Sequence, residues 1–200
     1  MLDAKTLSQY QLVWLSAPQR DLDATWRAVH AYLRNGGTAI LEDMGDQNDW
    51  HRNTSEEREL LGGLRLIGHV RGELKVERKG SPFFNDLPES ARVHPDVPCA
   101  AWRQPKANTE LEFHGQLVAW GKPQGAVLMK RRFGKGRLYA LAVPIGFHTL
   151  WRGPTFDPLA RSIVRDAVAG RYEPLYEQIA KARWDIDGIK PATVPVRFSD

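Results

Sequence analysis

Two short apolar runs flank an amphipathic stretch near the start of the chain, and together they predict a strand, a helix and a second strand. The first run, residues 10–17 (YQLVWLSA), ends at Pro18 and is typical of a strand that is buried on both faces. Asp21 is a suitable N-cap for the helix that follows. The apolar positions of this helix recur at the spacing of one helical face: Leu22, Trp26, Val29 and Leu33.

Gly36 and Gly37 end the predicted helix, because glycine adopts the left-handed conformation of a helix C-terminus without steric cost. Residues 38–41 (TAIL) form the second strand, and the strand–helix–strand order predicts parallel pairing. In α/β proteins, ligands bind where parallel strands end. The residues expected to bind a ligand there follow the two strands: Pro18, Gln19, Glu42, Asp43 and Gly45.

The middle of the chain carries weaker signals. A capping box at 54–57 starts a helix that is expected over residues 55–61, and Gly62 ends it. A short strand is expected over residues 64–70. Residues 80–105 contain five of the thirteen prolines of the chain and are predicted to be mostly extended loop.

From about residue 109 the pattern becomes that of an antiparallel sheet. Strands are expected over residues 117–120, 126–132 and 137–143, and the last two are joined by a tight glycine turn at 133–136 (FGKG). A loop is expected over residues 145–148. Helices are predicted over 157–169, where Pro158 lies in the first turn, and over 173–184.

The composition is that of an ordinary globular protein. Of the 200 residues, 42% are hydrophobic and 26% are charged, and the net charge of +4 permits acidic partners without requiring them. A single cysteine, Cys99, excludes an intramolecular disulfide. The sequence shows neither a signal peptide nor an apolar run long enough to span a membrane, so we expect a cytoplasmic protein. No His or Cys spacing matches a structural zinc site, and we expect no metal or cofactor.

The order of these features resembles the class I glutamine amidotransferase-like superfamily. Residues 10–17 look like the family strand that carries the oxyanion loop, and residues 38–45 look like the strand and sharp turn that carry the nucleophile. Phe147 and His148 are similar to the start of the family's Phe-His-Pro-Glu motif. The resemblance implies a flavodoxin-like three-layer α/β sandwich with a mainly parallel central sheet, an antiparallel hairpin extension and a C-terminal helical tail.

Two of the family's catalytic groups are missing at the matching positions. Asp43 stands where the catalytic cysteine would lie, and Leu150 stands where the family has a carboxylate after its histidine. The chain is therefore more similar to degenerate members of the superfamily, which serve as binding or oligomerisation domains. We expect a protein-binding or small-ligand-binding subunit of a larger assembly, without cysteine-dependent glutaminase activity. The alternative is a hydrolase that uses Asp43 as its nucleophile and His148 as its base. Carboxylates after a strand are, however, more typical of helix caps and solvated turns.

Two further segments bear on possible partners. Residues 1–170 form the predicted amidotransferase-like domain, and residues 171–200 form a helix and an extended docking tail. The aromatic stripe of this tail would bind a protein partner or a second copy of the chain, or would fold back on its own sheet. The stripe consists of Tyr172, Tyr176, Ile179 and Trp184.

The predicted hairpin carries five positive charges: Lys130, Arg131, Arg132, Lys135 and Arg137. A nucleic-acid-associated subunit, the second alternative function, would use them to contact phosphates. Charges at a strand edge also protect a sheet from aggregation. We favour this protective role over nucleic-acid binding, because only one aromatic residue, Phe133, accompanies the charges.

Overall fold

The strand–helix–strand unit that the apolar pattern predicts begins the fold. The computed structural model describes residues 3–16, 22–42, 55–104 and 110–169. After the short helix α1 (Ala4–Leu7), strand β1 (Leu12–Ser16) pairs in parallel with strand β2 (Thr38–Glu42), and helix α2 (Leu22–Arg34) connects them. The predicted apolar stripe of α2 is confirmed, because Trp26 and Val29 are among its buried side chains.

Five strands form the central sheet, in the order β1-β2-β11-β10-β7. β1, β2 and β11 are parallel, whereas β10 is antiparallel to both of its neighbours, β11 and β7. The sheet is thus an α/β sheet with a parallel half and an antiparallel half, and the predicted hairpin forms its β10–β11 pair. The bounds of these strands are β7 (Leu111–His114), β10 (Leu128–Phe133) and β11 (Gly136–Leu141).

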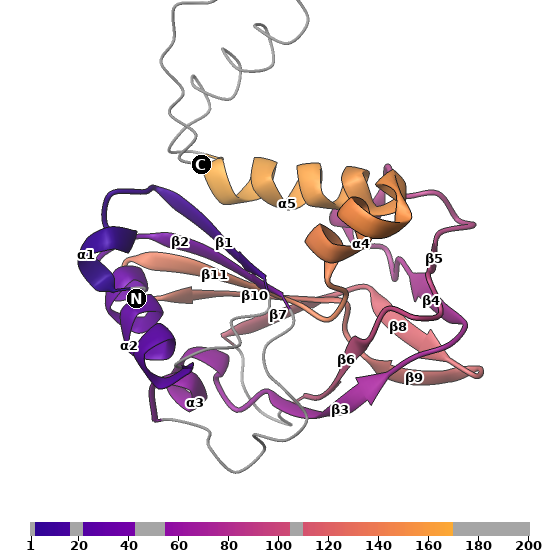
Figure 1. Cartoon of the computed structure of the whole chain (residues 1–200), viewed down its shortest axis with the longest axis horizontal. Helices are drawn as coiled ribbons and strands as arrows, with labels where there is room; N and C mark the ends of the chain where they lie inside the picture. Colours follow the sequence, from indigo (N-terminus) through magenta and orange to yellow (C-terminus); the bar gives the residue numbers. More distant parts are fainter. Residues whose placement is uncertain (1–2, 17–21, 43–54, 105–109, 170–200) are drawn as a thin grey trace, which may run out of the picture.

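Helices lie on both sides of this sheet (Figure 1). Side chains of successive strand residues point to opposite faces, so each strand contributes to two cores. Ala39 and Leu138 belong to the core beneath α2 and helix α3 (Ser55–Leu61), whereas Ile40 and Tyr139 belong to the core beneath helix α5 (Asp157–Val168). Helices α3 and α5 begin and end close to the predicted positions.

The remaining strands form two small antiparallel sheets at the side of the molecule away from α2 (Figure 1). One contains two strands, β3 and β6, and the other contains four strands in the order β5-β4-β8-β9. Their bounds are β3 (Arg65–Val70), β4 (Leu74–Glu77), β5 (Arg92–Val93), β6 (Cys99–Arg103), β8 (Gln116–Ala119) and β9 (Lys122–Gly125). No described helix is both long enough and apolar enough to cross a lipid bilayer.

Two of the sequence-based predictions are wrong, and a third is incomplete. β1 is an edge strand of the central sheet and only Val13 is buried in it, so its apolar run does not indicate burial on both faces. The proline-rich segment before residue 105 is mostly turns and loop, as expected, but it also supplies β5, β6 and a 3₁₀ turn (Pro82–Phe84), which the sequence did not predict. Residues 145–148 begin a helix, α4 (Ile145–Arg152), rather than a loop.

Helix α2 ends in a glycine cap that follows from the sequence. Gly36 has a φ angle of 104°, its N–H donates to the carbonyl of Leu33 at 3.0 Å, and the N–H of Gly37 donates to the carbonyl of Tyr32 at 3.0 Å. These two bonds define the Schellman arrangement of a helix C-terminus. The β10–β11 turn packs against this cap, because the N–H of Arg137 donates to the carbonyl of Gly37 at 3.1 Å.

The cap at Gly36 predicts a graded series of stabilities. A Cβ at this position would meet Lys135 Cβ at 3.6 Å, an ordinary contact, so the cost of a side chain comes from the positive φ angle. We expect Gly36→Val to lower the free energy of unfolding by about 1–2 kcal/mol. Gly36→Asn, which tolerates this conformation better, should cost less. Urea denaturation of both variants measures the difference, and equal stabilities would contradict the prediction.

Candidate functional site at the carboxyl edge of the central sheet

The parallel strands of the central sheet end together, and this edge holds the candidate site. Ser16 is the last residue of β1 and Glu42 is the last residue of β2, and the two are register partners. The chain that leaves β11 reaches the same edge and begins α4, whose second residue is Gly146. Three elements that are far apart in sequence therefore converge on the carboxyl group of Glu42.

Glu42 is completely buried, and the protein supplies its hydrogen-bond donors. The hydroxyl of Ser16 donates to Oε1 of Glu42. The backbone N–H of Gly146 donates to Oε1 and to Oε2, each at 3.0 Å. Because the first N–H groups of a helix have no partner within the helix, the carboxylate satisfies a group that would otherwise be unpaired at the start of α4.

Gly146 is required by this arrangement for steric reasons. A Cβ at residue 146 would lie 2.5 Å from Oε1 of Glu42 and 3.1 Å from Oγ of Ser16. Any larger residue would therefore separate the carboxylate from the helix. The site depends on the absence of a side chain here, and the backbone of Gly146 needs no positive φ angle.

Burial raises the pKa of Glu42, and the hydrogen bonds from Ser16 and from the backbone of Gly146 offset part of the rise. In catalytic sites, a hydroxyl group beside a carboxylate can be the nucleophile, with the carboxylate as its general base. The same carboxylate, however, also anchors the first turn of α4 to the end of β2. The geometry therefore fits an internal clamp between helix and sheet.

His148 lies on α4, two residues beyond Gly146, and it is enclosed by protein. Only 2% of its surface is exposed, and burial lowers its pKa. The backbone N–H of His94 donates to Nε2 at 3.4 Å, and the ring of Phe156 meets the imidazole edge-on with centroids 4.8 Å apart. Among the described contacts, no hydrogen bond or ion pair joins His148 to Glu42. A general base for hydrolysis needs a reactive nitrogen that can reach water.

The other residues that we expected to bind a ligand lie outside the described part of the chain. They are Pro18, Gln19, Asp43 and Gly45. The expected docking residues also lie outside it: Tyr172, Tyr176, Ile179 and Trp184. The predicted pairing of Asp43 with His148 and the division of the chain at residue 170 therefore stay predictions.

The basic hairpin is largely engaged with the protein itself. Arg131 is 6% exposed, and its guanidinium donates to the carbonyls of Glu59 and Leu60 at the end of α3, at 2.7 and 2.8 Å. It also pairs with the carboxylate of Glu110 at 2.7 Å. A cation at a helix C-terminus satisfies unpaired carbonyls and complements the helix dipole.

The neighbouring basic residues act on the other face of the sheet. Arg137 donates to the carbonyls of Asp166 and Ala169 at the end of α5, at 3.1 and 3.3 Å. Lys130 pairs with the carboxylate of Asp166 at 2.8 Å. Three of the five charges that the nucleic-acid alternative would use therefore hold helices on the sheet, whereas Arg132 and Lys135 are exposed.

The sequence alone does not single out Ser16 and Gly146. Both are small residues without a motif, and Gly146 lies 104 residues from Glu42. Glu42 itself was found, because it directly follows a buried strand. The strand pairing that brings β11 beside β2 would have been needed to find the other two.

No protein-family model matches the sequence, and neither does any curated protein. The fold is similar to that of a cytoplasmic protein from Salmonella typhimurium, with a TM-score of 0.60 and 12% identity over 84% of this chain and 75% of that chain. It is also similar to a ThuA-like protein from Bacteroides uniformis, with a TM-score of 0.57 and 17% identity over 84% of this chain and 74% of that chain.

A third similar structure is the β-galactosidase from Rahnella sp. R3, with a TM-score of 0.51 and 15% identity over 78% of this chain but only 23% of that chain. At these identities the similarities show the fold alone. ThuA-like proteins have a class I glutamine amidotransferase-like fold, so the resemblance noted in the sequence is supported at the level of the fold.

The raised pKa of Glu42 predicts a pH-dependent stability. The folded protein holds the proton of this carboxyl group more tightly than the unfolded chain does. The contribution of this proton to the free energy of unfolding is therefore complete below about pH 4.5, and it is lost as the pH rises through the pKa of the folded state. Glu42→Gln cannot ionise. We therefore expect its melting temperature, relative to that of the wild type, to increase from pH 4.5 to pH 8.

Ser16→Ala is the matched variant for this measurement. It removes the hydroxyl that favours the ionised carboxylate, so its stability should fall more steeply with pH than that of the wild type. Thermal unfolding followed by circular dichroism gives all three curves. Parallel curves for the wild type and Glu42→Gln would contradict the prediction.

Arg131 and Arg132 are adjacent in sequence, but replacing each of them by alanine should affect the stability of the protein very differently. Arg131→Ala leaves two carbonyls of α3 without their donor, and we expect the free energy of unfolding to fall by about 2–3 kcal/mol. Arg132→Ala removes an exposed charge, and its effect should stay within about 0.5 kcal/mol. Urea denaturation distinguishes the two, and a comparable loss in both variants would show that Arg131 is not a structural cap.

Proposed function

We propose that this chain is a catalytically degenerate amidotransferase-like domain that acts as a protein-binding or small-ligand-binding subunit of a larger assembly. The proposal includes the finer fold description, a flavodoxin-like three-layer sandwich. The observation that carries it is the clamp at the carboxyl edge of the sheet. There, the buried carboxylate of Glu42 accepts hydrogen bonds from Ser16 and Gly146 and thereby closes the start of α4.

In α/β domains this edge is where ligands meet unpaired N–H groups at helix starts. Here a side chain of the protein takes the place that a ligand's negative charge would occupy. The thiol and the imidazole that amidotransferase chemistry would need are also buried. Cys99 is completely buried in the core beneath α5, and a thiol must reach its substrate as a thiolate to act as a nucleophile. His148 is buried against Phe156.

The structural similarities fit a role within an assembly. The similar part of the Rahnella β-galactosidase makes up only 23% of that chain, so this fold occurs there as one portion of a longer protein. A domain that has kept the fold and buried its polar edge groups can serve as a rigid support for a binding segment. In the proposed function, residues 171–200 are that segment, and their aromatic side chains are the anchors.

Truncation after Gly170 tests this function. We expect the shortened chain to keep its circular dichroism spectrum and to unfold cooperatively, while the full-length chain, but not the shortened one, self-associates in light scattering. Full-length protein with Tyr172, Tyr176, Ile179 and Trp184 all replaced by alanine is the control, and it should behave like the truncated chain. Neither the full-length chain nor the truncated chain should release ammonia from glutamine.

Two outcomes would contradict the proposal. Global unfolding of the truncated chain would mean that residues 171–200 complete the core rather than dock elsewhere. Ammonia release that is lost on replacing Cys99 by alanine would mean that the thiol is catalytic after all.

A further inference from the structure

A second surface, on the small sheet β5-β4-β8-β9, carries an exposed tryptophan. Trp120 is 72% exposed, the largest exposure of any large apolar residue among the described ones. Leaving apolar aromatic surface in water is unfavourable by about 25 cal/mol per Å². Exposed aromatic residues of this kind are typical of binding surfaces.

The backbone of Trp120 is unfavourable as well. Ala119 and Lys122 pair across the β8–β9 hairpin, so Trp120 and Gly121 form its two-residue turn, with φ angles of 50° and 73°. Two positive φ angles identify the turn type that prefers Asn, Asp or Gly at its first position, not a large aromatic residue. Strained residues of this kind concentrate at functional sites. Trp120 is thus unfavourable for folding in two independent ways.

Trp120 stands at the end of a groove on the solvent face of the same sheet. The groove has a volume of about 660 Å³, which is within the range of small-molecule sites. Arg92, Lys75 and Val118 are neighbours in register across β5, β4 and β8, so they form one row on its floor. Glu77 lies two residues from Lys75 on the same face of β4, and Glu73, which directly precedes β4, also lines the groove.

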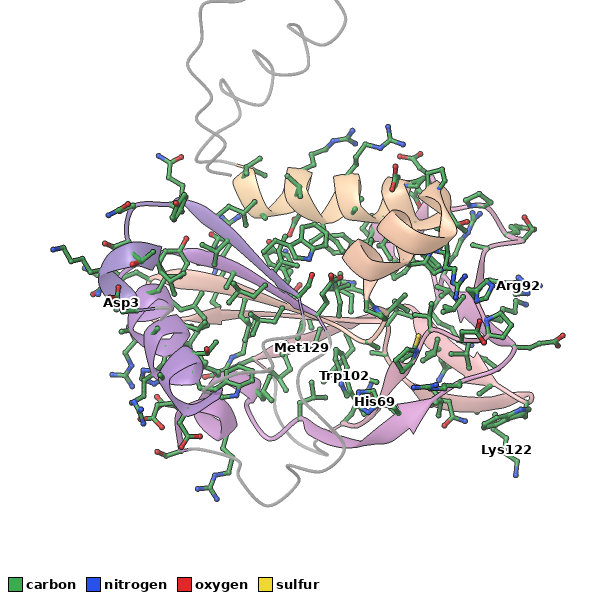
Figure 2. The ribbon with its side chains drawn as sticks, in the orientation of Figure 1. Asp3, His69, Arg92, Trp102, Lys122 and Met129 are labelled. Carbon is green, nitrogen blue, oxygen red and sulfur yellow. The ribbon has the colours of Figure 1, made fainter. Side chains whose placement is uncertain are left out.

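The polar groups of the groove are held in place. Nη1 of Arg92 donates to the carbonyls of Glu89 and Ala91 at 3.1 and 3.0 Å, which orients the guanidinium. The carboxylate of Glu77 pairs with Lys79 at 2.9 Å. Figure 2 shows Arg92 and Lys122 at the end of the molecule where this small sheet lies. Because Lys122 does not line the groove, it provides a control position on the same hairpin.

The charges that line the groove cancel. Glu73 and Glu77 oppose Lys75 and Arg92, so neither an anion nor a cation is favoured by the lining as a whole. A neutral ligand that carries many hydroxyl groups is favoured, because each hydroxyl can donate to a carboxylate and accept from an ammonium or guanidinium group. A pyranose ring also has an apolar C–H face, which a tryptophan ring can cover.

We propose that the groove over β5-β4-β8-β9 is a saccharide-binding site in which a neutral sugar stacks on Trp120 and hydrogen-bonds to Glu73, Lys75, Glu77 and Arg92. This site is separate from the carboxyl edge of the central sheet. It does not depend on the docking role of residues 171–200, so either proposal can fail while the other holds.

Nuclear magnetic resonance titration of the ¹⁵N-labelled full-length protein tests the site. The chain has seven tryptophans and hence seven indole N–H signals, and the signal that disappears in Trp120→Asn belongs to Trp120. Maltotriose, cellotriose, mannotriose and lactose are the probes. At least one of them should shift the Trp120 signal in a saturable manner.

Trp120→Asn removes the ring and places a residue that the turn prefers, so the variant should fold at least as well as the wild type. It should weaken saccharide binding, followed in this variant through the backbone amide signals, by about tenfold or more, which corresponds to about 1.4 kcal/mol. Lys122→Ala should leave the affinity unchanged.

Three results would overturn the proposal. They are the absence of a Trp120 shift with every probe, an unchanged affinity in Trp120→Asn, and a change from oligomer to monomer in Trp120→Asn by light scattering. The last result would assign the groove to a protein interface instead.

Discussion

The structure depends on β2, a strand that is almost completely shielded from solvent. Every residue of β2 is buried, because β1 and β11 pair with its two edges and helices cover both of its faces. Its last residue is nevertheless a glutamate. A buried carboxyl group is unfavourable unless the protein replaces its lost water, and the hydroxyl of Ser16 and the N–H of Gly146 do so. The position of α4 relative to the sheet follows from this requirement.

The same principle explains the positive charges along β10 and β11. Successive residues of a strand point to opposite faces, so neighbouring basic side chains reach different helices. Arg131 reaches the last carbonyls of α3 on one face, and Arg137 reaches the last carbonyls of α5 on the other. Each guanidinium replaces water at a helix end. A cluster that looks like a nucleic-acid contact in the sequence is thus largely a pair of helix caps in the fold.

The sequence was sufficient for features that are decided by neighbouring residues. The stripe of α2, the cap at Gly36, the bounds of α3 and the β10–β11 hairpin all depend on contacts within a few residues. Features decided by distant contacts were not recovered. Prolines before residue 105 indicated mostly loop, and β5 and β6 within that segment were not predicted, because they form by pairing with β4 and β3. For the site, the sequence identified Glu42 but neither of its donors, since these come from β1 and α4.

The pairing of β2 with β11 also has a consequence for how the chain acquires its structure. Thr38 and Arg137 are register partners although roughly 100 residues separate them, and strands β3 to β10 are made in between. Long-range pairing of this kind slows folding, because a large loop must close before the contact forms. During synthesis, β2 therefore leaves the ribosome well before its central neighbour exists. Its apolar residues would meanwhile be exposed to aggregation and to chaperones.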